Sequence, residues 1–303
     1  MFISDEVLRI VHLVAHYQSI ATAAEQLNKV PSALSYTIKK LEESLGVELF
    51  ERKGRNIGLT PSGEYFIQHS KPILNDIDSL CRNTTLIHTG VEQELTVAFN
   101  NIVPKNIISE FISEFEKTFD FTQLTVNTEV YNGCWDAIYH NRADVVVGAP
   151  HSVPSSDGII SEHVGYMDWD FVVGPQHSLA THIHPLENRE LRQYTAVCIR
   201  DTATNFIPLY AWHLEGQKAV FVPDLEIAIS LIKSNTAIGY LPHHLARPLL
   251  NNGRLIKKSM LEHKHATQLF VAAKTDGLGE AGRWCLEYWL RPDIKFRLAL
   301  LQS

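Results

Sequence analysis

A short stretch near the N-terminus carries the side chains that proteins use to contact nucleic acid. Hydroxyl groups, an aromatic ring and two ammonium groups recur there at helical spacing, on residues Ser32, Ser35, Tyr36, Lys39 and Lys40. Such groups bind phosphate oxygens and hydrogen-bond to base edges in a major groove. The pattern predicts a surface that reads DNA, with a solvated helix face as the plainer alternative.

The apolar residues of the same stretch predict the helix that positions these groups. Leu34, Ile38, Leu41 and Leu45 form one stripe at roughly 100° per residue. Pro31 suits the first helical position, because its missing N–H would be unpaired there anyway. We therefore expect this helix to bury its apolar stripe and to present the polar set on the other side.

Two shorter helices are expected before it. Apolar residues recur at helical spacing from Val7 to Val14, and Ser19 can cap a second helix over residues 20–27, which is built from small residues. Residues 28–30 then form a tight turn. A short helix and a tight turn before a helix with a polar face favour a DNA reader over a solvated surface.

A basic hairpin is expected next. Two short extended runs between Glu48 and Thr60 flank a turn that contains glycine, which predicts paired strands. The turn carries Arg52, Lys53 and Arg55. A basic tip beside a recognition helix suits the DNA backbone or a narrow minor groove, so we expect Arg52 and Arg55 to form a wing.

A long helix should follow the hairpin. Thr60 can cap a helix that starts at Pro61 and stops near Gly90, and its 29 residues would span roughly 43 Å, with Pro72 as a possible kink. Apolar residues recur every seven positions at Phe66, Ile73, Leu80 and Ile87. A heptad stripe favours pairing with a second copy of the helix, and packing against the chain's own domains is the alternative.

From about residue 92, predicted strands alternate with helices. The expected strands are 95–99, 123–130, 144–148, 170–174, 195–200, 218–222, 238–242 and 268–273. The expected helices are 107–119, 134–140, 224–235 and 280–290. This alternation is typical of parallel sheets that are covered on both faces.

Polar residues follow several of these strands, and ligands of such sheets bind at the carboxyl ends of strands. The candidate effector-binding residues are Asn100, Asn101, Tyr131, Asn132, Ala149, Arg200, Asp201 and Thr202. Asparagine and threonine offer donors and acceptors, and Tyr131 and Trp135 are placed to stack on a planar ligand. Asn100 is equally suited to capping a helix. The convergence of these candidate residues at the ends of several strands predicts a small-molecule site.

Composition limits the class of protein. The 303 residues carry a net charge of −7, and seven basic side chains offset seven acidic ones in residues 1–60, so the rest of the chain carries the whole excess. An acidic body behind a locally basic segment fits a protein that touches DNA with one end. No apolar run reaches the roughly 20 residues of a membrane span, and the acidic N-terminus is unlike a signal peptide, which together predict a cytoplasmic protein.

Sites for other chemistry are not apparent. The four cysteines lie far apart and are expected to be reduced thiols, and the 15 histidines lack the spacing of a metal site. The chain has no nucleophile elbow, phosphate loop or dinucleotide fingerprint. These observations predict no metal, no cofactor and no enzymatic activity.

The run from Ser32 to Arg52, continued by residues 59–63, resembles the signature of LysR-type transcription regulators. The resemblance implies that Ser32, Ser35, Tyr36 and Lys39 face the DNA, that the long helix pairs, and that a two-lobed domain like periplasmic binding proteins follows. Residues 237–242 resemble a segment of that domain. The family often has a hydroxyl residue where Val30 stands, so the recognition helix lacks a usual cap.

Other segments resemble one subgroup of this family. These are residues 30–37, 99–103 and 131–138, together with the pair Asp201-Thr202 and Trp212. The subgroup controls purine nucleoside uptake and, more distantly, allantoin use. Residues 205–210 depart from it, because they lack the basic residues expected there. A purine nucleoside or related nitrogen compound is the effector that the resemblance implies.

The predicted architecture is a winged helix-turn-helix at 1–60, a linker and dimerisation helix at 61–90, and a two-lobed α/β effector-binding domain at 91–303. One lobe covers about 91–163 and 267–303, the other about 164–266. The predicted function is sequence-specific DNA binding that regulates transcription under the control of a small-molecule effector. Expected partners are double-stranded DNA, further copies of the chain in a dimer and a tetramer, and RNA polymerase, with no membrane. The alternatives are an α/β enzyme or a solute-binding protein with a fused DNA-binding domain.

Overall fold

The structure is a computed structural model that describes residues 3–53, 56–89, 92–151, 158–209, 212–262 and 264–299. The chain divides into two compact units, Met1–Thr85 and Leu86–Ser303. Each unit has its own apolar core, so each is described by itself.

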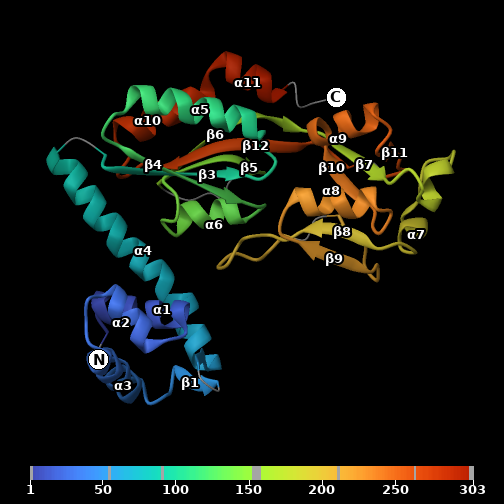
Figure 1. The fold of residues 1–303 in the computed structure, drawn as a ribbon. Helices are drawn as coiled ribbons and strands as arrows, with labels where there is room; N and C mark the ends of the chain where they lie inside the picture. Colours follow the sequence, from blue (N-terminus) through green and yellow to red (C-terminus); the bar gives the residue numbers. More distant parts are fainter. Residues whose placement is uncertain are drawn as a thin grey trace. The chain divides into compact units, whose positions relative to one another are not determined.

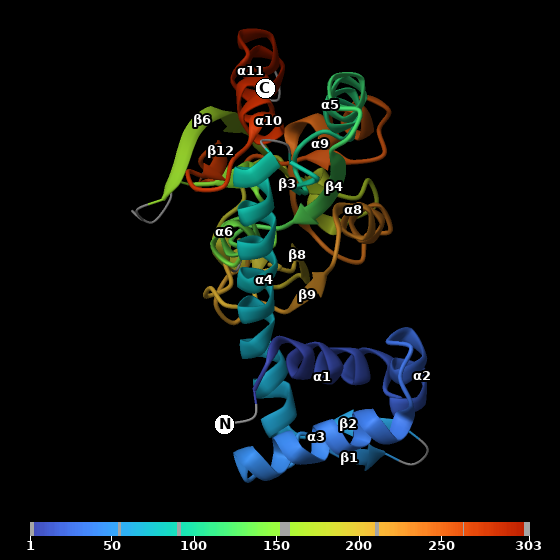
Figure 2. The ribbon, with the colours of Figure 1, turned by 90° about the vertical axis from the view of Figure 1, so that its left-hand side faces the viewer.

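The first unit is built from helices and one hairpin (Figures 1 and 2). Its elements are α1 (Asp5–Tyr17), α2 (Ile20–Gln26), α3 (Pro31–Leu45), β1 (Phe50–Lys53), β2 (Asn56–Leu59) and α4 (Pro61–Thr89), whose last four residues belong to the second unit. The hydroxyl oxygens of Ser4 and Ser19 accept hydrogen bonds from the first turns of α1 and α2. The apolar residues predicted on the inner faces of α1 and α3 are buried together, which confirms the predicted three-helix core.

The third helix and the hairpin are joined by one side chain. An Oε1 atom of Glu42 accepts hydrogen bonds from the backbone N–H groups of Leu49 at 2.7 Å and Phe50 at 3.1 Å. The start of α3 has no side-chain cap, because Val30 stands at that position and is 62% exposed. Pro31 begins the helix as predicted.

Helix α4 is continuous over 29 residues, with Pro72 inside it. The hydroxyl oxygen of Thr60 accepts a hydrogen bond of 3.0 Å from the backbone N–H of Gly63, as expected for a capping residue. None of the helices in the described residues is long and apolar enough to cross a membrane.

The second unit contains a five-stranded sheet in the order β4-β3-β5-β12-β6. Its strands are β3 (Glu94–Asn100), β4 (Gln123–Glu129), β5 (Val145–Pro150), β6 (Ile159–Met167) and β12 (Thr267–Lys274). The helices α5 (Lys105–Thr118) and α10 (Glu280–Leu290) cover one face, and α6 (Gly133–Tyr139) covers the other (Figure 1). The helix α11 (Pro292–Ala299) packs near β6.

Smaller sheets make up the rest of the second unit. One has the order β10-β7-β11, and the other pairs β8 with β9. The strands are β7 (Trp169–Val173), β8 (Ala196–Ile199), β9 (Ala219–Val222), β10 (Gly239–Pro242) and β11 (Ile256–Lys257). The helices are η1 (Ser178–Thr181), α7 (Asn188–Leu191), α8 (Leu225–Lys233) and α9 (His243–Asn251).

The sheets are mixed, where alternation alone predicted parallel ones. Strand β3 is parallel to β4 and β5, and β8 is parallel to β9, but β12 is antiparallel to both β5 and β6. The physical reason is that the chain crosses from the five-stranded sheet to the other sheets and back again. It leaves through β6 into β7 and returns through β12, so β12 runs in the opposite direction to β6. The first passage uses β6, which the sequence did not predict, as it did not predict α7, α9, α11 and β11.

Candidate functional site

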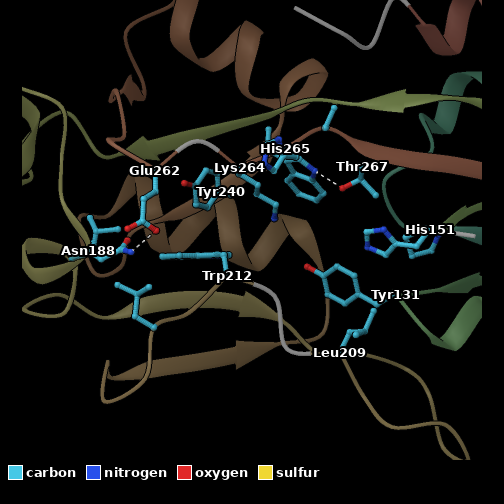
Figure 3. Close-up of a pocket in the computed structure, with 15 residues that line it drawn as sticks. Tyr131, His151, Asn188, Leu209, Trp212, Tyr240, Glu262, Lys264, His265 and Thr267 are labelled. Carbon is cyan, nitrogen blue, oxygen red and sulfur yellow. Dashed lines mark hydrogen bonds between the residues drawn. The ribbon is translucent and has the colours of Figure 1, made fainter.

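The second unit contains a cavity of about 440 Å³ that could hold a small ligand. It lies where the chain passes from β6 into β7 and from residue 262 into β12 (Figure 3). Its lining comprises Tyr131, Pro150, His151, Trp169, Asn188, Leu191, Leu209, Trp212, Leu214, Tyr240, Glu262, Lys264, His265, Ala266 and Thr267. The volume falls within the range of roughly 300–1,000 Å³ that is common for small-molecule sites.

Aromatic rings form much of this lining. The ring centres of Trp212 and Tyr240 are 5.3 Å apart at an interplanar angle of 74°, and both rings pack on the buried Phe171. Trp169 is held by a hydrogen bond of 2.9 Å from its Nε1 to the hydroxyl of Thr267. Rings that are fixed in this way offer flat surfaces to a planar ligand.

A few polar groups face the same space. The amide Nδ2 of Asn188 donates a hydrogen bond of 2.8 Å to the Glu262 carboxylate. Figure 3 shows the ammonium end of Lys264 directed into the cavity, toward the space bounded by Trp212 and the hydroxyl of Tyr131. Few, convergent polar groups in an apolar lining are typical of sites that orient a ligand.

Burial shifts the pKa values of Lys264 and of two tyrosines in the lining. It lowers the pKa of the Lys264 ammonium to about 8, since desolvation disfavours the charged form. Burial also raises the pKa of the Tyr131 hydroxyl well above its ordinary value, and that of Tyr240 in the same direction. At neutral pH the cavity therefore holds neutral phenols and a predominantly charged amine.

Two residues of the lining have left-handed backbone conformations. Tyr131 follows β4 with φ of 49°, and His151 follows β5 with φ of 62°. Such angles are uncommon for residues other than glycine and concentrate at functional sites. The turns after these two strands thus bring both side chains to the cavity.

The eight predicted effector-binding residues divide into two groups. Tyr131 lines the cavity, and the other seven lie outside its lining. Asp201 is buried and accepts hydrogen bonds from four backbone N–H groups, those of Asn132, Gly133, Ala203 and Leu209. Its carboxylate thus holds the segment after β8 against the start of α6.

Thr202 strengthens the same connection. Its hydroxyl donates to the carboxylate of Glu129 and accepts a hydrogen bond of 2.9 Å from the N–H of Val130. The Glu129 carboxylate also pairs with Arg142. A Cβ atom on Gly133 would lie 1.8 Å from the Thr202 hydroxyl, so only glycine fits there. We name Asp201 and Thr202 the latch, because they fasten the residues after β8 to the end of β4 and the start of α6.

The remaining predicted residues have other surroundings. Asn100 is buried, and its Oδ1 accepts a hydrogen bond of 3.3 Å from Ile102 N–H. The amide nitrogen of Asn101 is buried without a recorded partner among the described residues. Ala149 is buried in β5, Asn132 donates its amide to the Ile207 carbonyl, and Arg200 is exposed.

The prediction that Trp135 stacks on a ligand is wrong. Trp135 is 3% exposed, packs in the core on the buried side of α6 and donates its Nε1 to the carbonyl of Pro150 at 3.0 Å. The ring therefore has no free face to offer.

The sequence singled out only part of the lining. Trp169 and Tyr240 lie in short strands whose apolar patterns resemble those of core strands, and Lys264 lies between strands. Tyr131 was predicted as a site residue, Trp212 carried a signal through its resemblance to the purine and allantoin subgroup, and Tyr240 lies in the family-like segment 237–242, but Trp169 and Lys264 carried none. The partial exposure of aromatic rings at strand ends is visible only once the sheets are assembled.

The polar face of α3 is exposed as its pattern predicts. Ser32, Ser35, Lys39 and Lys40 are exposed, and Tyr36 is 66% exposed. The apolar stripe is buried at its first three residues and half-buried at Leu45. Figure 2 shows the β1-β2 hairpin beside this helix. Arg52 is exposed on β1, and Arg55 lies outside the described residues.

The heptad residues of α4 differ in exposure. Phe66 packs against the core of the first unit, while Ile73 is 51% and Leu80 67% exposed. The side chain of Ile87 lies outside the described part of the chain. Two large apolar side chains seven residues apart are thus left open to solvent on one helix.

No group of three or more His, Cys, Asp or Glu side chains is arranged to hold a metal ion within the described ranges. Three of the four cysteines, Cys134, Cys198 and Cys285, are buried thiols, and Cys81 is exposed.

Comparison with known proteins identifies the family. Residues 6–64 match the helix-turn-helix domain of bacterial regulatory proteins of the lysR family, and residues 88–291 match the LysR substrate binding domain. The regulator PunR of Escherichia coli K12 is 32% identical over 94% of this chain and 92% of its own length. The activator AllS of Klebsiella pneumoniae is 33% identical over 84% of this chain and 94% of its own length.

Solved structures agree at the level of the fold. CbnR, a LysR family transcriptional regulator, superposes with a TM-score of 0.59 at 14% identity and covers 98% of this chain and 99% of its own. A full-length OxyR variant of Pseudomonas aeruginosa gives a TM-score of 0.54 at 17% identity, covering 95% of this chain and 98% of its own. The chain belongs to the LysR family of DNA-binding transcription regulators, which carry an effector-binding domain and are not enzymes.

Proposed function

We propose that this regulator responds to a purine nucleoside or a related nitrogen compound held in the aromatic cavity. The observation that carries the proposal is the lining itself, in which Trp169, Trp212, Tyr240 and Tyr131 surround about 440 Å³. Stacking of a base on an aromatic side chain contributes about 1–3 kcal/mol in nucleic-acid sites, so several such rings suit a flat heterocycle. The similarity to PunR and AllS, and the resemblance of residues 131–138 to the purine and allantoin subgroup, support the same class of ligand.

In this proposal the first 60 residues read DNA. The exposed polar face of α3 enters the major groove, with Ser32, Ser35, Tyr36, Lys39 and Lys40 as the contacting residues. Arg52 and Arg55 of the hairpin contact the adjacent backbone or minor groove. This assignment rests on exposure and chemistry, because hydroxyl, phenol and ammonium groups are the donors that phosphates and base edges require.

Self-association completes the proposed assembly. Residues 61–90 pair with a second copy through Phe66, Ile73, Leu80 and Ile87, since Ile73 and Leu80 are large, apolar and exposed. A dimer would bind two half-sites on the DNA, and a tetramer would bind more than one pair of half-sites. Residues 91–303 then bind the effector, and RNA polymerase is the further partner expected at a promoter.

Effector binding would act on DNA through a coupling between two sites. A ligand in the cavity contacts residues of both the five-stranded sheet and the β10-β7-β11 sheet, so it favours one arrangement of these sheets. Coupling of this kind typically amounts to about 1–3 kcal/mol and is reciprocal, so operator DNA should tighten effector binding by the same factor.

Calorimetry on the full chain tests the proposal. Purine nucleosides should bind, and Trp212→Ala and Tyr131→Ala should weaken that binding while leaving operator affinity without effector unchanged. Tyr166→Ala is the matched control, because Tyr166 is an exposed aromatic residue of β6 outside the cavity. If purine nucleosides fail to bind, or if they bind without altering the footprint on the operator, the proposed effector role is wrong.

A further inference from the structure

Among the described residues that line the cavity, Lys264 is the one lysine, and its surroundings are aromatic. Its Nζ atom lies 4.0 Å from the centre of the Trp169 ring and 5.1 Å from that of Tyr240. The face of an aromatic ring attracts a cation, but it has no lone pair that could accept a conventional hydrogen bond. The ammonium group has three donors and no acceptor.

No oxygen or nitrogen acceptor for these donors is recorded among the described residues. The carboxylate of the described lining, Glu262, instead accepts a hydrogen bond from Asn188. By contrast, Lys258 lies at the start of the segment that joins β11 to β12, and its ammonium donates to the backbone carbonyls of Ala180 and His182. Lys264 is thus a desolvated cation with open donors that point into a ligand-sized space (Figure 3).

Leaving such a group without a hydrogen-bonding partner is costly, because the buried charge loses its hydration and the two ring faces offset only part of that loss. The lowered pKa of Lys264 is the signature of that loss. A ligand that brings an oxygen to the ammonium restores a charge-assisted hydrogen bond, whereas a ligand that brings an amino group presents a donor to a donor.

We propose that Lys264 makes the cavity selective for planar heterocycles that carry an oxo oxygen, and against those with an amino group at the same ring position. The inference rests on the proposed function, because it assigns the ligand's polar edge within the same cavity. Trp169, Trp212 and Tyr240 would hold the ring by its faces, and Lys264 would hold one edge. Glu262, beside Asn188 in the lining, is left to accept from a donor on the ligand (Figure 3).

Two matched pairs of nucleosides test the selectivity. Inosine and adenosine differ by an oxo against an amino group on a purine, and uridine and cytidine differ in the same way on a pyrimidine. Binding to the full chain is measured by calorimetry for the wild type, Lys264→Met and Lys264→Arg. Lys233→Met is the control, since Lys233 is an exposed lysine at the end of α8.

The oxo member should bind about tenfold to a hundredfold more tightly than the amino member, as expected for a hydrogen bond to a charged group. Lys264→Met should remove that preference, Lys264→Arg should retain part of it, and Lys233→Met should change nothing. Equal binding of inosine and adenosine to the wild type, or a preference that survives in Lys264→Met, would overturn the inference while leaving a purine effector in place.

The pyrimidine pair separates the two proposals. A preference for uridine over cytidine that depends on Lys264, with neither purine bound, would support the role of Lys264 and overturn the purine effector. Failure of all four nucleosides to bind a chain that still binds its operator would overturn both.

Discussion

The Nζ atom of Lys264 lies 4.0 Å from the centre of the Trp169 ring. Trp169 begins β7 and Lys264 precedes β12, so this contact joins the two segments by which the chain passes between its sheets. A desolvated cation–π contact contributes on the order of 2 kcal/mol, which offsets part of the loss of hydration. Within the described residues, the other titratable groups of this site are Cys198 and the lining residues Tyr131, His151, Tyr240, Glu262 and His265.

The first prediction concerns stability against pH in the absence of effector. The folded pKa of Lys264 is about 8, below the ordinary value of 10.5, so the unfolded chain binds more protons between these values. Stability contributed by this site should therefore rise as pH increases through that window. Urea denaturation of the wild type and Lys264→Met, compared at each pH, isolates the effect from other titrating groups. A difference between the two proteins that is flat with pH would contradict it, and Lys233→Met should follow the wild type.

The second prediction concerns effector affinity against pH. A ligand oxygen bound to the ammonium favours its charged form, so binding should be tightest below pH 8 and should weaken as pH rises through the pKa of the free protein. Calorimetry with inosine across that range measures the trend. Lys264→Met should bind weakly at every pH, and a wild-type affinity that is constant with pH would mean that the amine does not touch the ligand.

The third prediction concerns the polar face of α3. Ser35→Ala, Tyr36→Ala and Lys39→Ala should each weaken specific operator binding without loss of folding, because these side chains are exposed. If Lys39 contacts a phosphate, its loss should lower the salt slope by about 0.9, and if it reads a base, discrimination at one position should fall by about 1–3 kcal/mol. Ser44→Ala, at the far end of the same helix, is the control. Unchanged operator affinity in all three variants would remove the recognition-helix assignment.

The fourth prediction concerns the heptad stripe of α4. Ile73→Glu combined with Leu80→Glu should convert a dimeric fragment of residues 1–90 into a monomer, because charges would replace two exposed apolar side chains in the proposed seam. Sedimentation measures the assembly, and circular dichroism checks that the helices persist. Lys71→Glu reverses an exposed charge on the same helix away from the stripe and should leave the dimer intact. A double variant that remains dimeric would place the seam elsewhere.

The fifth prediction concerns the latch. Asp201→Asn should lower the free energy of unfolding by about 1–3 kcal/mol, since an amide cannot accept from all four backbone donors that the carboxylate holds. Thermal and urea denaturation measure the loss, with the exposed Asp276→Asn as the control. An effect no larger than that of Asp276→Asn would show that the segment after β8 is held by other contacts.

The sequence by itself determined the elements whose signals are local. The stripe of Leu34, Ile38 and Leu41 and the proline before it predicted α3 from its first residue to its buried face, because helical periodicity is written in neighbouring positions. Alternating strands and helices predicted most of the second unit, and the signature after Ser32 identified the family.

Only the tertiary structure decided which side chains meet. Asp201 and Thr202 looked like ligand contacts because they follow a strand, yet their hydrogen bonds are made to the start of α6 and to Glu129 at the end of β4. Trp169 and Lys264 lie far apart in the sequence and meet because the chain passes between its sheets twice. Contacts of that kind depend on the pairing of strands that are far apart in the sequence. The apolar pattern of one strand predicts whether a residue is buried, but it does not predict which residue packs against it.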